Sequence, residues 1–185
     1  MNGIKSKTAK TKAFLNPDQL LRAVPLKSGM TVVDFGCGNG YYAVAAGAIV
    51  GKKGRVFALD IMEDALSQAS TLARMVGLRN VSTEACDLEK FGSCKLPDTV
   101  ADMIIIASLL HQAENKDNVI REAYRVLKTG GHLLAVEWNS DALLGPAPSV
   151  RISEKQVREL LEKHGLRPAG TLPAGAFHYA LLYSK

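Results

Sequence analysis

The sequence predicts a single α/β domain built on a doubly wound, mostly parallel seven-stranded sheet with an antiparallel last strand. Apolar, β-branched runs alternate with helical patterns between residues 31 and 138, as βαβ units require. A glycine-rich turn follows the first of these runs, and two closely spaced runs end the chain, which predicts a hairpin. The 185 residues suffice for one such core and contain no internal repeat.

The charge is concentrated at one end of the chain. The formal net charge is +5, and four lysines lie in the first dozen residues: Lys5, Lys7, Lys10 and Lys12. We therefore expect residues 1–13 to be a basic, disordered leader and residues 14–185 to form a nearly neutral domain. A neutral domain carries no strong nucleic-acid signal.

Neither a membrane span nor a signal peptide is evident from the apolar runs. The cysteines are Cys37, Cys86 and Cys94, an odd number without a C-x-x-C motif. This usage favours small buried thiols and a cytoplasmic location.

The helices are expected where apolar residues recur at helical spacing. Asn16 and Pro17 form a helix start, and that short helix should run through Val24 and end near Pro25. The other helices are expected over 41–50, 62–76, 117–128 and 153–165, with Thr129-Gly130-Gly131 stopping the fourth of the five helices.

The strands are expected around Val32 and Val33 and over 55–60, 80–85, 101–107, 132–138, 166–172 and 177–183. The segment 101–107 is the most apolar and should be central, whereas 80–85 is less apolar and should lie nearer an edge. Residues 89–98 show little periodicity, so any helix there is short or absent, and 139–150 is irregular.

The first strand, its glycine turn and the following helix predict a ligand site. Glycines at 36, 38 and 40 let a ligand approach the backbone and permit positive φ. Asp34 adds a carboxylate at the mouth of the strand, which suits a ligand that carries a cation and repels a pyrophosphate. The dinucleotide fingerprint also needs a small residue where this chain has Tyr41, so the loop disfavours NAD.

The motif Asp34-Phe35-Gly36-Cys37-Gly38-Asn39-Gly40 resembles the first motif of class I S-adenosylmethionine-dependent methyltransferases. The segment 125–131 resembles the late motif of that family, and the likeness covers about residues 16–185. Within the family the chain looks most similar to the small quinone-biosynthesis-like and general methyltransferases. The resemblance implies a Rossmann-like methyltransferase fold, S-adenosylmethionine as cofactor and S-adenosylhomocysteine as product, without a metal.

Two further acids belong to the expected cofactor site. Asp60 ends the second strand twenty residues after Gly40, where a carboxylate can accept hydrogen bonds from a ribose, although it could instead serve the next helix as a cap. The resemblance implies that Asp87 faces the adenine amino group. The full expected cofactor set is Asp34, Gly36, Cys37, Gly38, Asn39, Gly40, Asp60, Ile61, Asp87, Leu88, Ala107 and Ser108.

Methyl transfer from a sulfonium requires placement first, and a base only where the acceptor must lose a proton. His111, just beyond the central strand, is the candidate catalytic base, but it could equally cap a helix or pack. Relatives often carry an acid directly after this histidine, whereas this chain has Gln112, so packing is the favoured reading. Glu137, Trp138 and Arg151 are candidate acceptor-binding residues, and Trp138 could instead lie beneath the irregular segment.

Three functions remain open on sequence grounds. The first is methyl transfer to a small molecule by a monomer or homodimer. The second is methyl transfer to a protein side chain such as lysine, and the third is a module that binds S-adenosylmethionine without turnover. An NAD-dependent oxidoreductase is disfavoured by Asp34 and Tyr41.

Overall fold

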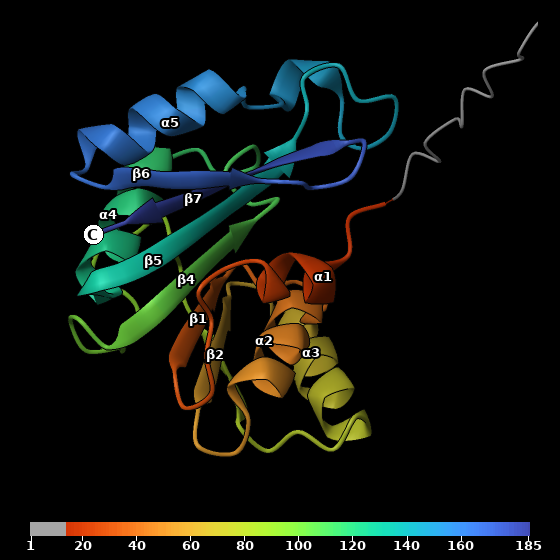
Figure 1. Cartoon of the computed structure of the whole chain (residues 1–185), viewed down its shortest axis with the longest axis vertical. Helices are drawn as coiled ribbons and strands as arrows, with labels where there is room; N and C mark the ends of the chain where they lie inside the picture. Colours follow the sequence, from red (N-terminus) through yellow and green to blue (C-terminus); the bar gives the residue numbers. More distant parts are fainter. Residues whose placement is uncertain (1–13) are drawn as a thin grey trace, which may run out of the picture.

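Seven strands form one sheet in the order β3-β2-β1-β4-β5-β7-β6 in the computed structural model (Figure 1), which describes residues 14–185. The strand β7 is antiparallel to both of its neighbours, and all other adjacent strands pair in parallel. The expected doubly wound sheet with an antiparallel last strand is therefore confirmed, whereas the expected leader lies outside the described residues. The strands are β1 (Thr31–Phe35), β2 (Arg55–Asp60), β3 (Val81–Ala85), β4 (Ala101–Ala107), β5 (Leu127–Trp138), β6 (Arg167–Leu172) and β7 (His178–Ser184).

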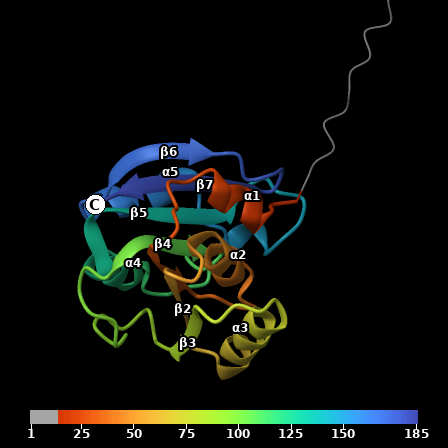
Figure 2. The same ribbon diagram turned by 60° about the horizontal axis from the view of Figure 1, so that its bottom comes forward.

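The helices cover the two faces of the sheet (Figures 1 and 2). One layer contains α1 (Pro17–Arg22), α2 (Tyr41–Val50) and α3 (Glu63–Met75). The other contains α4 (Lys116–Val126) and α5 (Glu154–Lys163), and a short 3-10 helix, η1 (Pro148–Val150), precedes α5. No helix was found over the segment 89–98, as its lack of periodicity predicted.

Alternation along the central strand explains the two cores. Ile104 and Ile106 of β4 pack into the cluster that contains α4 and α5, while Met103 and Ile105 pack into the cluster beneath α2 and α3. All four side chains are at most 1% exposed. A parallel strand buried on both faces reads as a continuous apolar run, which is why 101–107 was identified as central.

The order of the sheet reverses at β1, which has β2 on one side and β4 on the other. In open parallel sheets, ligands bind outside the carboxyl ends of the strands at such a switch point. The turns after β1 and β4 are therefore placed at the position where a ligand is expected.

Several element boundaries differ from those expected. The helix α1 ends at Arg22 instead of Val24, and α4 ends at Val126 while β5 already begins at Leu127. Residues 129–131 therefore belong to β5 and do not stop the helix. Their backbone is held by the chain end, because Gly130 N donates to Lys185 O over 3.0 Å and Lys185 N to Gly131 O over 3.1 Å.

The cysteines also differ from expectation. All three are buried, as predicted, but Cys86 and Cys94 form a disulfide with their Cα atoms 5.2 Å apart. The prediction of three separate thiols is therefore wrong for this pair, and only Cys37 is free. The two residues meet because the segment after β3 folds back on itself, which spacing alone does not reveal.

Candidate active site

A cavity of about 570 Å³ opens where β1, β2, β3 and β4 end. We call it the strand-end cavity; its volume lies in the range of small-molecule sites. Eight of the expected cofactor residues line it: Gly36, Gly38, Asn39, Asp60, Ile61, Asp87, Leu88 and Ser108. The other four, Asp34, Cys37, Gly40 and Ala107, do not, so any effect that they have on a ligand is exerted through the loop or the strands.

Two glycines of the turn are required for different structural reasons. Gly38 has φ +48°, and a Cβ added there would meet nothing within 4 Å, because that side of the loop faces open space at the cavity. A Cβ on Gly40 would instead lie 2.6 Å from the Cβ of Ala69 in α3. Gly38 thus leaves room for a ligand, whereas Gly40 lets α2 and α3 approach each other.

Asp60 connects the glycine turn to the start of α3. Its Oδ2 accepts a hydrogen bond from Gly38 N over 2.9 Å, and its Oδ1 accepts one from Met62 N over 3.0 Å. Because a carboxylate has about four acceptor positions, both oxygens can accept further hydrogen bonds from a ligand in the cavity. The N-cap of α3 is Met62, so Asp60 is not the helix cap that was the alternative reading.

Asp34 lies beneath the loop and is only 1% exposed. Burial raises the pKa of its carboxyl to about 7, and the negative charge of Asp60 raises it further, against a hydrogen bond from Ala43 N that lowers it. Its Oδ2 has no hydrogen-bond partner within residues 14–185. A buried oxygen without a partner is costly, so this site favours a cationic group nearby.

The third acid lies at the opposite end of the cavity. Asp87 is exposed, and its Oδ1 accepts a hydrogen bond from Glu89 N over 3.1 Å. Its other oxygen has no hydrogen-bond partner among residues 14–185, so it is available to a donor on a ligand. The structure therefore surrounds one cavity with two of the three expected acids and sets the third beneath its loop.

His111 is held by a carboxylate from the neighbouring strand. Its Nδ1 lies 2.8 Å from Oε2 of Glu137, and the two side chains are 8% and 1% exposed. The Oε1 of Glu137 accepts from Leu110 N over 2.7 Å and from His111 N over 3.4 Å. The side-chain hydrogen bonds of Glu137 are thus all directed at the segment after β4, so its influence on an acceptor acts through His111.

His111 faces a second cavity, of about 550 Å³, which we call the His111 cavity. It lies between the start of α4 and the η1–α5 region, and it is lined among others by Lys116, Val150, Ile152 and Gln156. Because Ser108, Leu109, Gln112 and Ala113 line the strand-end cavity, the segment 108–113 borders both cavities. His111 itself lines the His111 cavity and does not line the strand-end cavity.

The other two acceptor candidates have structural contacts. The ring of Trp138 packs on His178 with centroids 4.0 Å apart and has Gly145 against its face, so the irregular segment covers it. Arg151 lines the His111 cavity, but its guanidinium donates to carbonyls of that same segment. These are the carbonyls of Asn139, Ser140, Ala142, Leu144 and Pro146. Acceptor contact by either residue stays a prediction.

The backbone after β4 is unusual at the cavity edge. Ser108 has φ +54°, which is costly for a residue with a Cβ. The conformation is fixed by a hydrogen bond from Ser108 N to Val136 O over 2.8 Å, and Gln112 Nε2 donates to Ser108 O over 2.6 Å. Gln112 therefore takes part in shaping the site, although relatives often have an acidic residue at this position.

Sequence reasoning missed one side of the strand-end cavity. Met62, Asp64, Ala65 and Gln68 line it from the first turns of α3. The sequence contains a signal for this wall, because residues 64, 65 and 68 follow helical spacing shortly after Asp60 and so share one helix face. None of these residues belongs to a motif.

No helix within residues 14–185 is long and apolar enough to cross a membrane. No group of three or more potential metal ligands was found within the same range. The expectation of a reaction without a metal stays a prediction.

Comparisons with known proteins agree with this geometry. The family model described as "Methyltransferase domain" matches residues 26–168. An arsenite methyltransferase of Aquipseudomonas alcaligenes is 34% identical over 117 residues, which is 61% of this chain and 34% of that protein. A ubiquinone/menaquinone biosynthesis C-methyltransferase of Escherichia coli is 33% identical over 115 residues, 62% of this chain and 45% of that protein.

The chain thus spans between a third and a half of the length of these curated relatives. Among solved structures, a SAM-dependent methyltransferase from Aquifex aeolicus superposes with a TM-score of 0.84 at 30% identity. That match covers 92% of this chain and 89% of the other, so it extends over the whole sheet. The chain therefore belongs to the methyltransferase-domain family of class I S-adenosylmethionine-dependent methyltransferases.

Proposed function

We propose that this chain transfers the methyl group of S-adenosylmethionine to a small-molecule acceptor that loses a proton, with His111 as the base. The single observation that carries the proposal is the segment 108–113, which borders the strand-end cavity and places a carboxylate-held histidine on its other side. The named relatives are an arsenite methyltransferase and a ubiquinone/menaquinone biosynthesis C-methyltransferase, and these names support a small-molecule acceptor.

The residues present fit the cofactor. The unpartnered Asp34 Oδ2 suits a ligand with cationic groups, and the open side of Gly38 leaves the loop backbone accessible. Asp60 has acceptor capacity for ribose hydroxyls, and Asp87 for the adenine amino group. When bound, S-adenosylmethionine supplies an electrophilic methyl group on a sulfonium.

Glu137 gives His111 the properties of a base. In the tautomer that carries its proton on Nδ1, His111 donates to the Glu137 carboxylate, and Nε2 can then accept a proton from the acceptor. The same carboxylate fixes the ring orientation, because it also binds the backbone amide of His111. Position 112 is not acidic, but Glu137 of β5 places a carboxylate beside His111. This contact favours a catalytic role for His111 over a packing role.

Variants of the pair test this role. If His111 removes a proton, His111→Ala should lower turnover on the order of 10²–10⁴-fold while the affinity for S-adenosylmethionine stays nearly unchanged. Glu137→Gln should give a smaller loss, together with a changed pH–rate profile, because it perturbs the tautomer without removing the ring. Turnover, cofactor affinity and melting temperature are measured on the same preparations.

A stable His111→Ala variant with nearly normal turnover would show that the histidine only packs. A variant that loses turnover only because its lower melting temperature leaves it partly unfolded would support the same conclusion.

The acceptor class requires a separate experiment. The protein is incubated with labelled S-adenosylmethionine and cell extract, and the labelled products are separated by size. We expect label in the small-molecule fraction. Label in protein would support a protein methyltransferase instead, and binding without any labelled product would support a non-catalytic module.

A further inference from the structure

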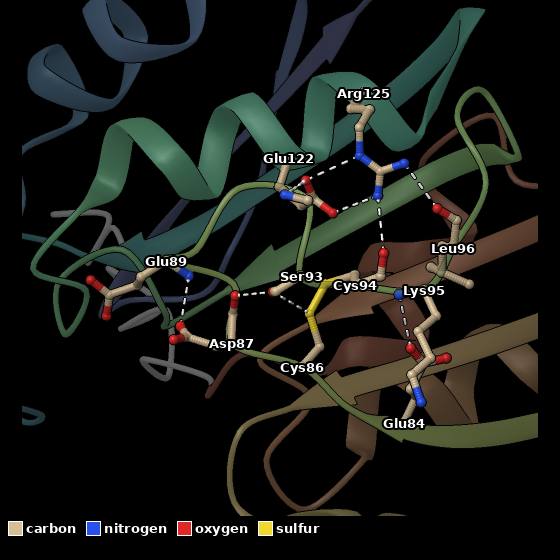
Figure 3. Close-up of a disulfide and its surroundings, with 11 residues drawn as sticks. Glu84, Cys86, Asp87, Glu89, Ser93, Cys94, Lys95, Leu96, Glu122 and Arg125 are labelled. Carbon is tan, nitrogen blue, oxygen red and sulfur yellow. Dashed lines mark hydrogen bonds and ion pairs between the residues drawn. A yellow bond between two sulfur atoms is a disulfide. The ribbon is translucent and has the colours of Figure 1, made fainter.

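One wall of the strand-end cavity belongs to a short covalent ring. The disulfide joins Cys86, the first residue after β3, to Cys94, eight positions later (Figure 3). Within this ring, Cys86, Asp87, Leu88 and Glu89 all line the cavity. The bond therefore closes the segment that holds the expected adenine contact.

The two ends of the ring are anchored to different parts of the fold. At one end, Cys86 N donates to Asp60 O over 3.0 Å, which ties it to β2. At the other end, Arg125 of α4 donates to Cys94 O over 3.3 Å and to Leu96 O over 2.9 Å. Cys86 and Cys94 themselves are the covalent link between the strand side and the helix side of this wall.

One of the two disulfide-bonded residues borders the cavity. Cys86 and Cys94 are only 5% and 4% exposed, but Cys86 is a lining residue whereas Cys94 is not. A reagent therefore approaches the bond from the space that a bound cofactor would fill. Occupancy of the cavity and access to the disulfide should exclude each other.

We propose that the Cys86–Cys94 pair is a redox-responsive element that sets the affinity of the strand-end cavity for S-adenosylmethionine, the oxidised form binding more tightly. The inference rests on the proposed function insofar as this cavity is the cofactor site. Without the bond, the wall can adopt more conformations, and the ordering of these on binding reduces the affinity.

The chemistry is thiol–disulfide exchange with a dithiol reductant. A thiolate of the reductant attacks the Cys86 sulfur, the bond to Cys94 breaks, and Cys94 leaves as a thiolate that takes up a proton. The second thiol of the reductant then displaces Cys86 from the mixed disulfide. Two electrons and two protons pass to the cysteines, and the reductant becomes a disulfide.

The reduced form has a partner for one of its two new thiols. The Oγ of Ser93 lies 3.5 Å from the Cys86 sulfur and donates a hydrogen bond to Asp87 O (Figure 3). A Cys86 thiol can donate to this hydroxyl, so reduction leaves this buried sulfur–hydrogen donor with an acceptor. The same hydroxyl connects the state of Cys86 to the backbone of Asp87.

Affinity and redox equilibrium are then linked. If the oxidised form binds the cofactor more tightly by some factor, the bound cofactor must stabilise the disulfide by the same factor. For a three- to tenfold difference in affinity, the reduction midpoint should fall by about 15–30 mV at saturation, since a tenfold change corresponds to 29.6 mV.

The test compares the oxidised and the reduced chain. Their state is assigned by counting thiols after unfolding, since the oxidised chain retains only the Cys37 thiol. S-Adenosylhomocysteine is titrated calorimetrically into each form, and we expect three- to tenfold tighter binding by the oxidised form. Cys94→Ser is the matched variant, because it breaks the bond without altering a cavity-lining side chain; it should bind weakly in both oxidising and reducing buffer.

Equal affinity of the two wild-type forms would overturn the inference, as would a redox response that persists in Cys94→Ser. If that variant does not fold, the reduction midpoint of the wild type with and without S-adenosylhomocysteine decides, and an unshifted midpoint contradicts the proposal. Failure of both forms to bind S-adenosylhomocysteine would instead contradict the proposed function itself.

Discussion

Residues of the motif 34–40 have different structural roles, although the motif suggests that all of them contact the cofactor. Asp34 and Gly40 belong to the same motif as Gly38, yet of these three residues Gly38 alone lines the strand-end cavity. Gly40 serves helix packing, and Asp34 acts from beneath the loop with an unpartnered oxygen. A motif therefore indicates a ligand site without assigning each of its members to the ligand.

Asp60→Ala should weaken S-adenosylmethionine binding by about 1.5–3 kcal/mol, the scale of lost charge-assisted hydrogen bonds. Glu63→Ala is the matched control, because Glu63 is an acid in the first turn of α3 that does not line the cavity. Calorimetry on both variants checks the assignment. An unchanged dissociation constant in folded Asp60→Ala would remove the ribose role.

The raised pKa of Asp34 predicts a dependence of stability on pH. Its pKa is about 7 in the folded chain and near 3.8 when unfolded, so the folded state binds the proton more tightly. The stabilisation by this proton is complete below the unfolded pKa and is lost as the pH rises towards 7.

Between pH 5 and 7 the wild type should therefore lose about 2 kcal/mol of unfolding free energy relative to Asp34→Asn. Urea unfolding of both proteins at several pH values measures this difference. Parallel pH profiles would show that burial does not perturb this carboxyl.

At the scale of elements, the contact between His111 and Glu137 arises because two neighbouring strands end side by side. The sequence did not predict this contact. Ala107 of β4 pairs with Val136 of β5, so the residues that follow them, Ser108 and Glu137, emerge side by side. Glu137 reaches His111 because of that register, although 26 positions separate the two. The register of parallel strands is set by packing along their whole length, and the sequence offers no local signal for it.

The contact between α2 and α3 gives an element-scale prediction. Gly40→Ala should lower the unfolding free energy by about 3 kcal/mol, because it adds a clash with Ala69 to the strain of a positive φ. Gly77→Ala is the matched control: Gly77 has φ +75° and a Cβ there meets nothing within 4 Å. It should lose only about 1 kcal/mol, the cost of the strain alone. Equal losses in denaturant titrations of both variants would contradict the packing role of Gly40.

At the scale of the whole molecule, apolar runs, the glycine turn and acids at strand ends predict most of the structure. They predict the sheet, its central strand and its antiparallel last strand, and most of the expected residues that line the strand-end cavity. The sequence did not predict the Cys86–Cys94 disulfide or the residues of α3 that line the cavity. Both depend on how loops return to the sheet. The boundary between α4 and β5 was wrong for a related reason: residues 129–131 are held by the distant chain end. Local patterns predict elements, and long-range contacts decide their limits.

The central claim is that the strand-end cavity holds S-adenosylmethionine against the glycine turn. Calorimetric titration of S-adenosylhomocysteine into the wild type and Gly38→Val tests it most directly, with circular dichroism confirming that both are folded. A valine at Gly38 would fill the open space beside the loop backbone. We predict one-to-one binding by the wild type and none by the folded variant, whereas native affinity in Gly38→Val would contradict the account.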